Sequence, residues 1–299
     1  MTTATLDVKT HEFDVEDIEY LRHGDKPLLA RVFRPRGEGP FPALVECHGG
    51  AWCLSDRTTE RLRHEAMATH GIVSIALDFR SGNEHPYPAS VQDINYALRW
   101  TKLNARALKT RADLVGLSGQ SSGGHLAMLV AMRPRDPHYA AIPLPLGSGR
   151  HDATVRCVVM SWPVINPLSR YRLAQRALAG ANPPEWPKSI IPRHDAYWRN
   201  EANMAEGNPM LALERDEKLA TPPAIWFQRP RRPAARLQGR GSKLSRQRAA
   251  ALRCELPQGR RRDHAGVYRC RAARWSPAGP VEDRRHVRAA FVTRHIKVN

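Results

Sequence analysis

Short apolar segments alternate with segments of helical spacing from residue 13 to residue 228, and this alternation limits the possible folds more than any other feature of the sequence. Such alternation is typical of crossover units, in which successive parallel strands join one sheet and the intervening helices cover it. The sequence therefore predicts an α/β fold with a mostly parallel central sheet flanked by helices.

The individual elements follow from the spacing of apolar residues. Strands are predicted at residues 13–22, 27–33, 43–47, 72–78, 113–117, 154–161 and 224–227. Helices are predicted at residues 57–70, 87–108 and 122–132. Residues 163–213 are longer than a simple crossover and contain several prolines, Trp186, Trp198 and two helical patches. We expect this stretch to be a lid insertion in a single domain that spans residues 1–299.

The charge of the chain is distributed unevenly. The net charge of +18 by itself favours a nucleic-acid-binding protein. Residues 229–299 hold 18 Arg and 2 Lys against four acidic residues, so 16 of the 18 charges lie there, and the rest of the chain is nearly balanced. The aromatic residues of this basic tail are few and are not interleaved as a stacking platform requires. Nucleic-acid binding through the tail is therefore kept only as an alternative, and we expect no nucleic-acid partner.

Targeting and redox features are few. The first 20 residues are acidic and polar, and no apolar run approaches the roughly 18 residues of a membrane span. The five cysteines are widely spread and form no CxxC pair, which argues against a disulfide framework and against a zinc knuckle. We expect a cytoplasmic protein with no membrane partner, and the oligomeric state is not determined by the sequence.

A candidate nucleophile lies where a predicted strand meets a predicted helix. The sequence GQSSG at residues 119–123 has the G-x-S-x-G pattern of a nucleophile elbow, a tight strand-to-helix turn that presents a serine hydroxyl. Glycines are needed because helix and strand approach closely in this turn and leave no space for side chains. The start of the helix also offers free N–H groups where an oxyanion would form. Ser121 is therefore the candidate nucleophile.

A second glycine motif, HGGAW at residues 48–52, directly follows the predicted inner strand at 43–47. A glycine pair lets the backbone approach a substrate and direct N–H groups at a developing oxyanion. We predict that the N–H groups of Gly49, Gly50 and Ser122 form an oxyanion hole. An ordinary Gly-Gly turn would explain this motif if it stood alone.

Three motifs occur in order over about 80 residues: HGGAW at 48–52, DFRSGNEHPYPASVQDINYALRW at 78–100 and GQSSGGHLA at 119–127. In this order and spacing the chain resembles the hormone-sensitive-lipase-like and acetylesterase branch of the α/β-hydrolases, over roughly residues 20–228. The resemblance implies a serine carboxylesterase that hydrolyses short-chain acyl or aryl esters through an acyl-enzyme intermediate, with no metal and no cofactor. It also implies that residues 163–213 shape the acyl pocket. Formamidases, amidases and peptidases of the same fold are the alternatives.

The resemblance ends where the family places the partners of its serine. In that family an Asp or Glu follows the strand at 224–227, and a His precedes the last helix. This chain has RPRRP at 229–233 and ARWSP at 273–277 instead. Arg, Ala, Pro and Gly are the residues that a GC-rich coding sequence yields when it is read out of frame. We therefore hypothesise that residues 229–288, an anomalous Arg-rich segment, are frameshifted.

If this segment is translated as written, other residues have to serve as acid and base. The candidate bases are His264, His286 and His295, and the candidate acids are Asp263 and Asp283. None has the spacing from the last helix that the family shows. A serine hydrolase without both partners loses on the order of 10⁶ in turnover. We therefore expect the chain as written to be impaired.

Two charged positions in predicted helices have structural interpretations. Glu65 lies between His64 and His70, but the spacing HExxxxH does not place both imidazoles one turn apart as HExxH does. We interpret these three as surface helix residues rather than zinc ligands. Asp93 is interpreted as structural or as a cap partner.

Three residues could belong either to the site or to its surroundings. We expect His48 to hold the oxyanion loop by hydrogen bonds rather than to act as a base. Trp52 and Trp186 fit a substrate pocket and a packed core equally well.

Overall fold

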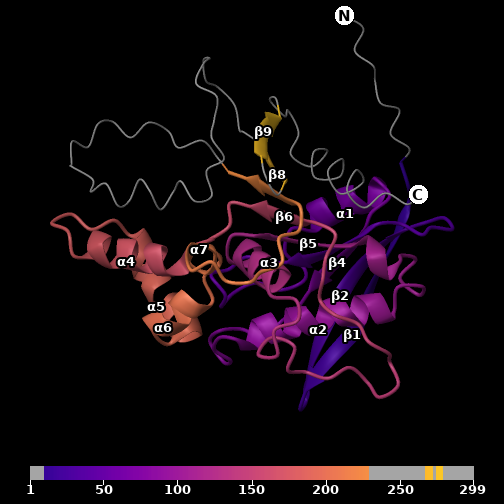
Figure 1. The fold of residues 1–299 in the computed structure, drawn as a ribbon, viewed down its shortest axis with the longest axis horizontal. Coiled ribbons are helices and arrows are strands. Elements are labelled where there is room, and N and C mark those ends of the chain that lie inside the picture. Colours follow the sequence, from indigo (N-terminus) through magenta and orange to yellow (C-terminus); the bar gives the residue numbers. More distant parts are fainter. Residues whose placement is uncertain (1–9, 229–266, 272–273, 279–299) are drawn as a thin grey trace, which may run out of the picture.

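The computed structural model describes residues 10–228 and the strands at 267–271 and 274–278. Within these ranges a nine-stranded sheet has the order β1-β2-β4-β3-β5-β6-β7-β8-β9 (Figure 1). Its strands are β1 (Phe13–His23), β2 (Lys26–Pro35), β3 (Ala43–Cys47), β4 (Val73–Leu77), β5 (Val115–Gln120), β6 (Val158–Ser161), β7 (Ala224–Phe227), β8 (Val267–Arg271) and β9 (Arg274–Ala278). The α-helices are α1 (Arg61–Thr69), α2 (Ala89–Leu103), α3 (Ser122–Met132), α4 (Pro167–Leu178), α5 (Trp186–Trp198), α6 (Glu201–Glu206) and α7 (Pro209–Glu214).

The centre of the sheet is parallel. Strands β4, β3, β5, β6 and β7 are neighbours in that order, and each neighbouring pair is parallel. Antiparallel strands extend both edges, with β1 and β2 on one side and β8 and β9 on the other. The predicted α/β-hydrolase fold, with a mostly parallel central sheet flanked by helices, is confirmed. Strands β8 and β9 lie within 229–288, where we had predicted no strand.

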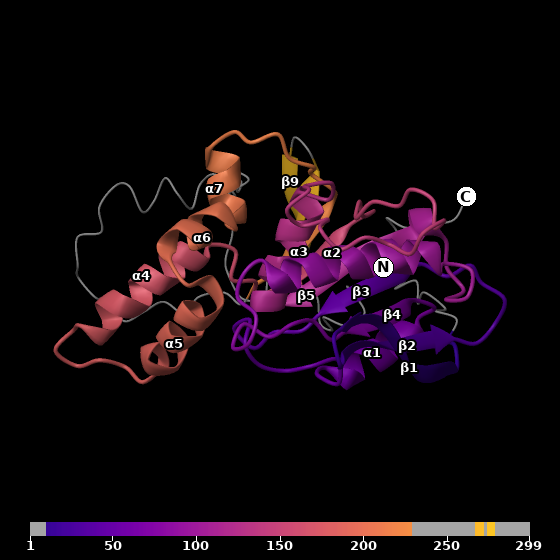
Figure 2. The same ribbon diagram turned by 90° about the horizontal axis from the view of Figure 1, so that it is seen from below.

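Helices cover both faces of the central strands (Figure 2). Helix α1 lies on one face, and α2 and α3 lie on the other. Because successive side chains of a strand point to opposite faces, β3 contributes to two cores. Val45 belongs to the larger core with α2 and α3, whereas Leu44 packs in a smaller core with Met67 of α1. This double burial explains why β3 and β4 are apolar along nearly their whole length.

Several predicted bounds match the structure, and others shift for local reasons. Strand β3, helix α3 and strand β7 have the predicted bounds. Helix α1 begins at Arg61 rather than at residue 57, because the Asp56 carboxylate accepts from the Thr58 N–H at 2.7 Å and holds a turn there. Helix α2 begins at Ala89 rather than at residue 87, because the N–H of Tyr87 donates to the carbonyl of Tyr197.

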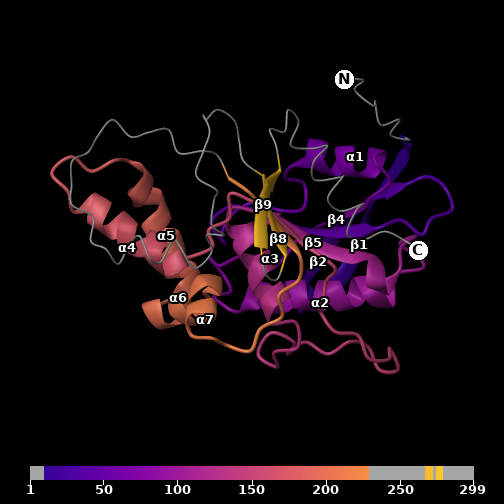
Figure 3. The same cartoon turned by 45° about the horizontal axis from the view of Figure 1, so that its top comes forward.

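The stretch predicted as a lid contains four helices, α4 to α7, instead of two helical patches. They lie together at one end of the sheet (Figures 1 and 3). Asn166, Asn200 and Asn208 each cap a helix start by accepting a backbone N–H, which divides the stretch into short helices. Within the described ranges, no helix combines the length and apolar character that crossing a membrane requires.

Candidate active site

The two glycine motifs meet at the point where the strand order reverses. The chain passes from β3 to β4 on one side, and β5 pairs with the other side of β3. In open α/β sheets such a switch point leaves a crevice beyond the carboxyl ends of the strands, where ligands bind. Cys47 at the end of β3 is the register partner of Gly119 in β5. The loops that follow these residues, HGG at 48–50 and QSS at 120–122, are therefore neighbours.

Ser121 has a backbone conformation that is rare for any residue with a side chain. Its φ is 51° and its ψ is −120°, outside the regions that non-glycine residues ordinarily populate. Hydrogen bonds on both sides hold it there. The N–H of Ser121 donates to the carbonyl of Ser161 at 2.9 Å, and its own carbonyl accepts from the N–H of Val164 at 3.0 Å. The strained turn between β5 and α3 is thus fixed by strand β6 and the loop after it.

Helix α3 can start this close to the sheet because Gly123 has no side chain. A Cβ at this position would lie 2.2 Å from the carbonyl oxygens of both Cys47 and His48. Such distances are shorter than any real contact, so the turn accepts only glycine. The close approach of helix and strand that was predicted for GQSSG is therefore present in the structure.

The HGG loop lies against the elbow. A Cβ on Gly49 would be 3.4 Å from the Cβ of Ser121, which is van der Waals contact. Gly50 has a φ of +104°, and its carbonyl accepts from the N–H groups of Cys53 and Leu54 in a tight turn. Within residues 10–228 the N–H groups of Gly49 and Gly50 donate to no backbone carbonyl. The N–H of Ser122 is in the first turn of α3, where helices leave donors without partners.

His48 holds this loop, as predicted. Its Nδ1 lies 2.8 Å from the carbonyl oxygen of Gly49, and its ring stacks on Phe79 with centroids 4.1 Å apart. Burial lowers the pKa of His48. The ring is therefore neutral at physiological pH and donates to the loop backbone.

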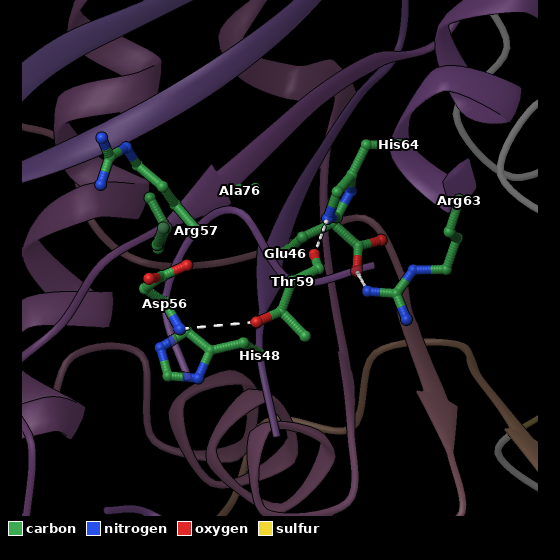
Figure 4. Close-up of a pocket in the computed structure, with 9 residues that line it drawn as sticks. Glu46, His48, Asp56, Arg57, Thr59, Arg63, His64 and Ala76 are labelled. Carbon is green, nitrogen blue, oxygen red and sulfur yellow. Dashed lines mark hydrogen bonds and ion pairs between the residues drawn. The ribbon is translucent and has the colours of Figure 1, made fainter. Parts of the chain in front are cut away.

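A charged network behind the loop was not predicted from the sequence. Gln120, which precedes the nucleophile, donates to Glu60 at 2.8 Å. Arg63 of α1 donates to Glu60 at 3.1 Å and to the buried Glu46 of β3 at 2.7 Å, as Figure 4 shows for Glu46 and Arg63. A Glu in an otherwise apolar strand was the only signal of this network in the sequence. The pocket in Figure 4 has no room for a water molecule, so it is packing space rather than a substrate site.

The surface interpretation of the HExxxxH segment is wrong for one of its members. His64 is only 2% exposed, and its two ring nitrogens lie 3.0 Å from the Ser74 hydroxyl and from the Thr59 carbonyl. Glu65 is paired instead with Arg61 on the same helix. Within the described part of the chain, no group of three or more His, Cys, Asp or Glu side chains could hold a metal ion.

Asp93 has the structural role that we predicted. Its carboxylate is fully buried and accepts from the backbone N–H and the side chain of Arg80, and it also lies 2.9 Å from a ring nitrogen of His23. These bonds tie α2 to the loop that follows β4 and to the end of β1.

Trp52 joins the segment after the HGG loop to the helices of residues 163–213. Its indole is 1% exposed and donates to Nδ1 of His125 at 3.3 Å. The other ring nitrogen of His125 donates to the carbonyl of Gly207 at 2.7 Å, and Tyr197 stacks on Trp52 with centroids 5.5 Å apart. Trp52 therefore belongs to the packed core, whereas Trp186, at the start of α5, is 40% exposed.

These buried histidines make the stability of the fold depend on pH. Burial lowers the pKa of His125 and of His194 to about 4, from 6.5. Between pH 4 and pH 6.5 the unfolded chain thus binds more protons than the folded protein. The free energy of unfolding is therefore highest above pH 6.5 and falls towards pH 4. We expect a loss of several kcal/mol across this window, measured by urea unfolding at half-unit steps.

His125→Asn should reduce the pH dependence but not remove it, because His194 remains, while the same change at the exposed His138 should leave it intact. A stability that stays constant between pH 6.5 and pH 4 in the parent chain would contradict this assignment.

Comparison with known proteins agrees with this geometry. The BD-FAE family model matches residues 32–175. The esterase LipC of Mycobacterium tuberculosis is 31% identical over 141 residues, which are 46% of this chain and 34% of LipC. The carboxylic ester hydrolase LipN of the same organism is 36% identical over 129 residues, 40% of this chain and 32% of LipN. The matches span about a third of the length of these curated relatives.

Solved structures show the same fold. An esterase of Pyrobaculum calidifontis superposes with a TM-score of 0.54 at 26% identity, over 67% of this chain and 62% of that one. Esterase B of Lactobacillus rhamnosis has a TM-score of 0.56 at 22% identity, over 72% of this chain and 65% of that one, and it shares the fold. The family match, these relatives and the strand–serine–helix turn agree with the motifs at 48–52, 78–100 and 119–127. The chain therefore has the α/β-hydrolase fold and is similar to carboxylesterases of that fold.

Proposed function

We propose that this protein is a serine carboxylesterase that cleaves small esters with short acyl or aryl groups, and that Ser121 is its nucleophile. The observation that carries the proposal is the strained backbone of Ser121, with the HGG loop in contact with it. Strain of this kind persists where the surrounding structure imposes it, and it is concentrated at functional sites.

In the proposed reaction, Oγ of Ser121 attacks the ester carbonyl carbon while a base takes its proton. The carbonyl oxygen becomes an oxyanion, which the N–H groups of Gly49, Gly50 and Ser122 stabilise; each such donor is worth on the order of 10²- to 10³-fold in rate. The C–O bond to the alcohol breaks as the base returns the proton to the leaving oxygen. Water then attacks the acyl-enzyme, and the acid product is released as Ser121 is reprotonated.

The base and its orienting acid are proposed to come from beyond residue 228. Within residues 10–228 no side chain is hydrogen-bonded to the hydroxyl of Ser121. The family position for the acid, at 229–233, and the candidates His264, His286, His295, Asp263 and Asp283 lie outside the described residues. The family position for the His, at 273–277, overlaps strand β9 and contains no His. The frameshift hypothesis for residues 229–288 stays a prediction, and it supplies the reason why the partners are absent from the sequence as written.

Labelling with a phosphonate ester tests the nucleophile directly. We expect one phosphonyl group on the peptide that contains Ser121, identified by mass spectrometry, and none in Ser121→Ala. Ser118→Ala is the matched control, since it removes a buried hydroxyl from the strand that leads into the elbow. A label on a different serine would overturn the assignment. So would the absence of label after prolonged incubation of both the chain as written and the protein translated from the alternative frame.

Substrate comparison tests the reaction class. We expect hydrolysis of p-nitrophenyl acetate to exceed that of formyl-amide substrates by at least about tenfold in kcat/KM, because the amine of an amide is a poorer leaving group and needs protonation by an acid that this chain lacks in its family position. Faster turnover of the formyl amide would instead support a formamidase of the same fold.

A further inference from the structure

Arg170, on helix α4, has one guanidinium nitrogen that is buried without a partner among the described residues. Its Nη1 atom is inaccessible to solvent and has no hydrogen-bond partner, and within residues 10–228 its guanidinium is in no ion pair. Arg99 is a useful contrast, because its partly buried guanidinium donates to Asn95 at 2.9 Å and to the carbonyl of Ile142 at 2.7 Å. An unpaired buried charge costs free energy. The described residues therefore provide no anionic partner for Arg170.

A second arginine increases this need. Burial lowers the pKa of Arg170, and the positive charge of Arg193 on helix α5 lowers it further. Helices α4 and α5 pack against each other. Within the described residues, Arg193 has no carboxylate partner either. Two like charges that are held together without a counter-ion are typical of a site for an anionic ligand.

The arginine pair borders the segment that follows the oxyanion loop. The carbonyl of Arg193 accepts from the thiol of Cys53 at 3.5 Å. The ring of His194 meets the edge of Trp52 with centroids 4.9 Å apart, and Arg170 is close enough for its charge to lower the pKa of His194. The backbone of Arg193 therefore lies against residue 53, and Arg170 lies near His194, which contacts Trp52.

The start of α4 is also tied to the nucleophile. The N–H of Val164, just before this helix, donates to the carbonyl of Ser121 at 3.0 Å. Leu168, in the first turn of α4, packs against the main core. Arg170 is two residues further along the same helix. The start of α4 is thus connected to the nucleophile turn through the segment at residues 164–168.

We propose that Arg170, with Arg193 beside it, binds a carboxylate of the substrate, so that the preferred substrates are acidic esters, such as monoesters of dicarboxylic acids. This inference rests on the proposed esterase function and adds a substrate class to it. A guanidinium presents two parallel N–H donors that match the two oxygens of a carboxylate, which makes the recognition geometrically specific. The anion would also remove the cost of the buried unpaired charge.

Binding to the full chain with the Ser121→Ala substitution tests the proposal without any need for turnover. We expect calorimetry to show monoethyl glutarate binding at least about tenfold more tightly than diethyl glutarate. Arg170→Met should abolish this preference. Arg176→Met, which removes the same charge from an exposed position of α4, should keep it. Equal affinity of the Ser121→Ala protein for the two esters would overturn the proposal. It would also be overturned if Arg176→Met reduced the preference for the monoester as much as Arg170→Met does.

The stability of the ligand-free protein gives a second readout. Because the Nη1 atom of Arg170 is buried without a partner among the described residues, Arg170→Met is expected to raise Tm in the absence of ligand, as substitutions that relieve a functional site often do. A residue that only supported the fold would lower Tm when replaced, and that result would contradict a binding role.

The two proposals fail in different ways. If only the acidic-ester inference is wrong, phosphonate still labels Ser121 and both glutarate esters bind alike. If the esterase proposal is wrong, Ser121 is not labelled, whatever the preference between the two esters.

Discussion

Restoring the alternative reading frame across residues 229–288 is expected to raise kcat for p-nitrophenyl acetate by on the order of 10⁴- to 10⁶-fold over the chain as written. The physical reason is that a serine hydroxyl is a weak nucleophile until a positioned base takes its proton, and the base needs an acid to orient it. The sequence as written has arginine and proline where the family has these two groups. The proposed oxyanion donors alone are expected to supply only a small part of the rate.

Sequencing the coding DNA across codons 225–290 shows whether an alternative open frame exists, and expression of both versions measures the effect. Ser121→Ala in each version is the control for hydrolysis that does not depend on the site. The frame hypothesis is refuted if the DNA contains no alternative frame, or if the peptide RPRRPAAR is found in a fully active native enzyme.

The parts of the fold that the sequence predicted well depend on local patterns. Strand β3 is an apolar run that ends at the HGG motif, and α3 begins at the serine of GQSSG, so both have clear boundaries. The position of Ser121 beside Gly49 also followed from topology, because both motifs come after parallel strands that pair at their carboxyl ends.

What the sequence did not predict depends on contacts between distant segments. The bond from Gln120 to Glu60 joins residues 60 positions apart, and neither residue type indicates a partner. The hydrogen bonds from Trp52 through His125 to Gly207 connect the segment after the HGG loop, helix α3 and the end of α6. The spacing of apolar residues does not indicate that these segments are in contact. The Nη1 atom of Arg170, which is buried without a partner among the described residues, is likewise not indicated by the sequence of helix α4. Such features become apparent only when the lid helices have been placed on the sheet.

The same topology explains why one glycine carries an unusual share of the stability. Gly123→Ala is expected to lower Tm by about 10 °C or more, or to prevent folding, because its Cβ would lie 2.2 Å from two carbonyl oxygens of the segment that joins β3 to the HGG loop. Relieving this clash requires moving either α3 or that segment, at a cost of about 3 kcal/mol or more.

Any Gly123→Ala protein that does fold should also lose about 10²-fold in ester turnover, since a displacement of about 1 Å between Ser121 and the oxyanion donors has an effect of this size. Gly180→Ala is the matched control, because its new Cβ would have only an ordinary contact at 3.4 Å. Its Tm should stay within about 2 °C of the parent. A Gly123→Ala protein that melts with the parent would show that helix α3 can withdraw from β3 without cost. In that case the close approach that strains Ser121 would not be imposed by the sheet, and the elbow would lose its physical basis.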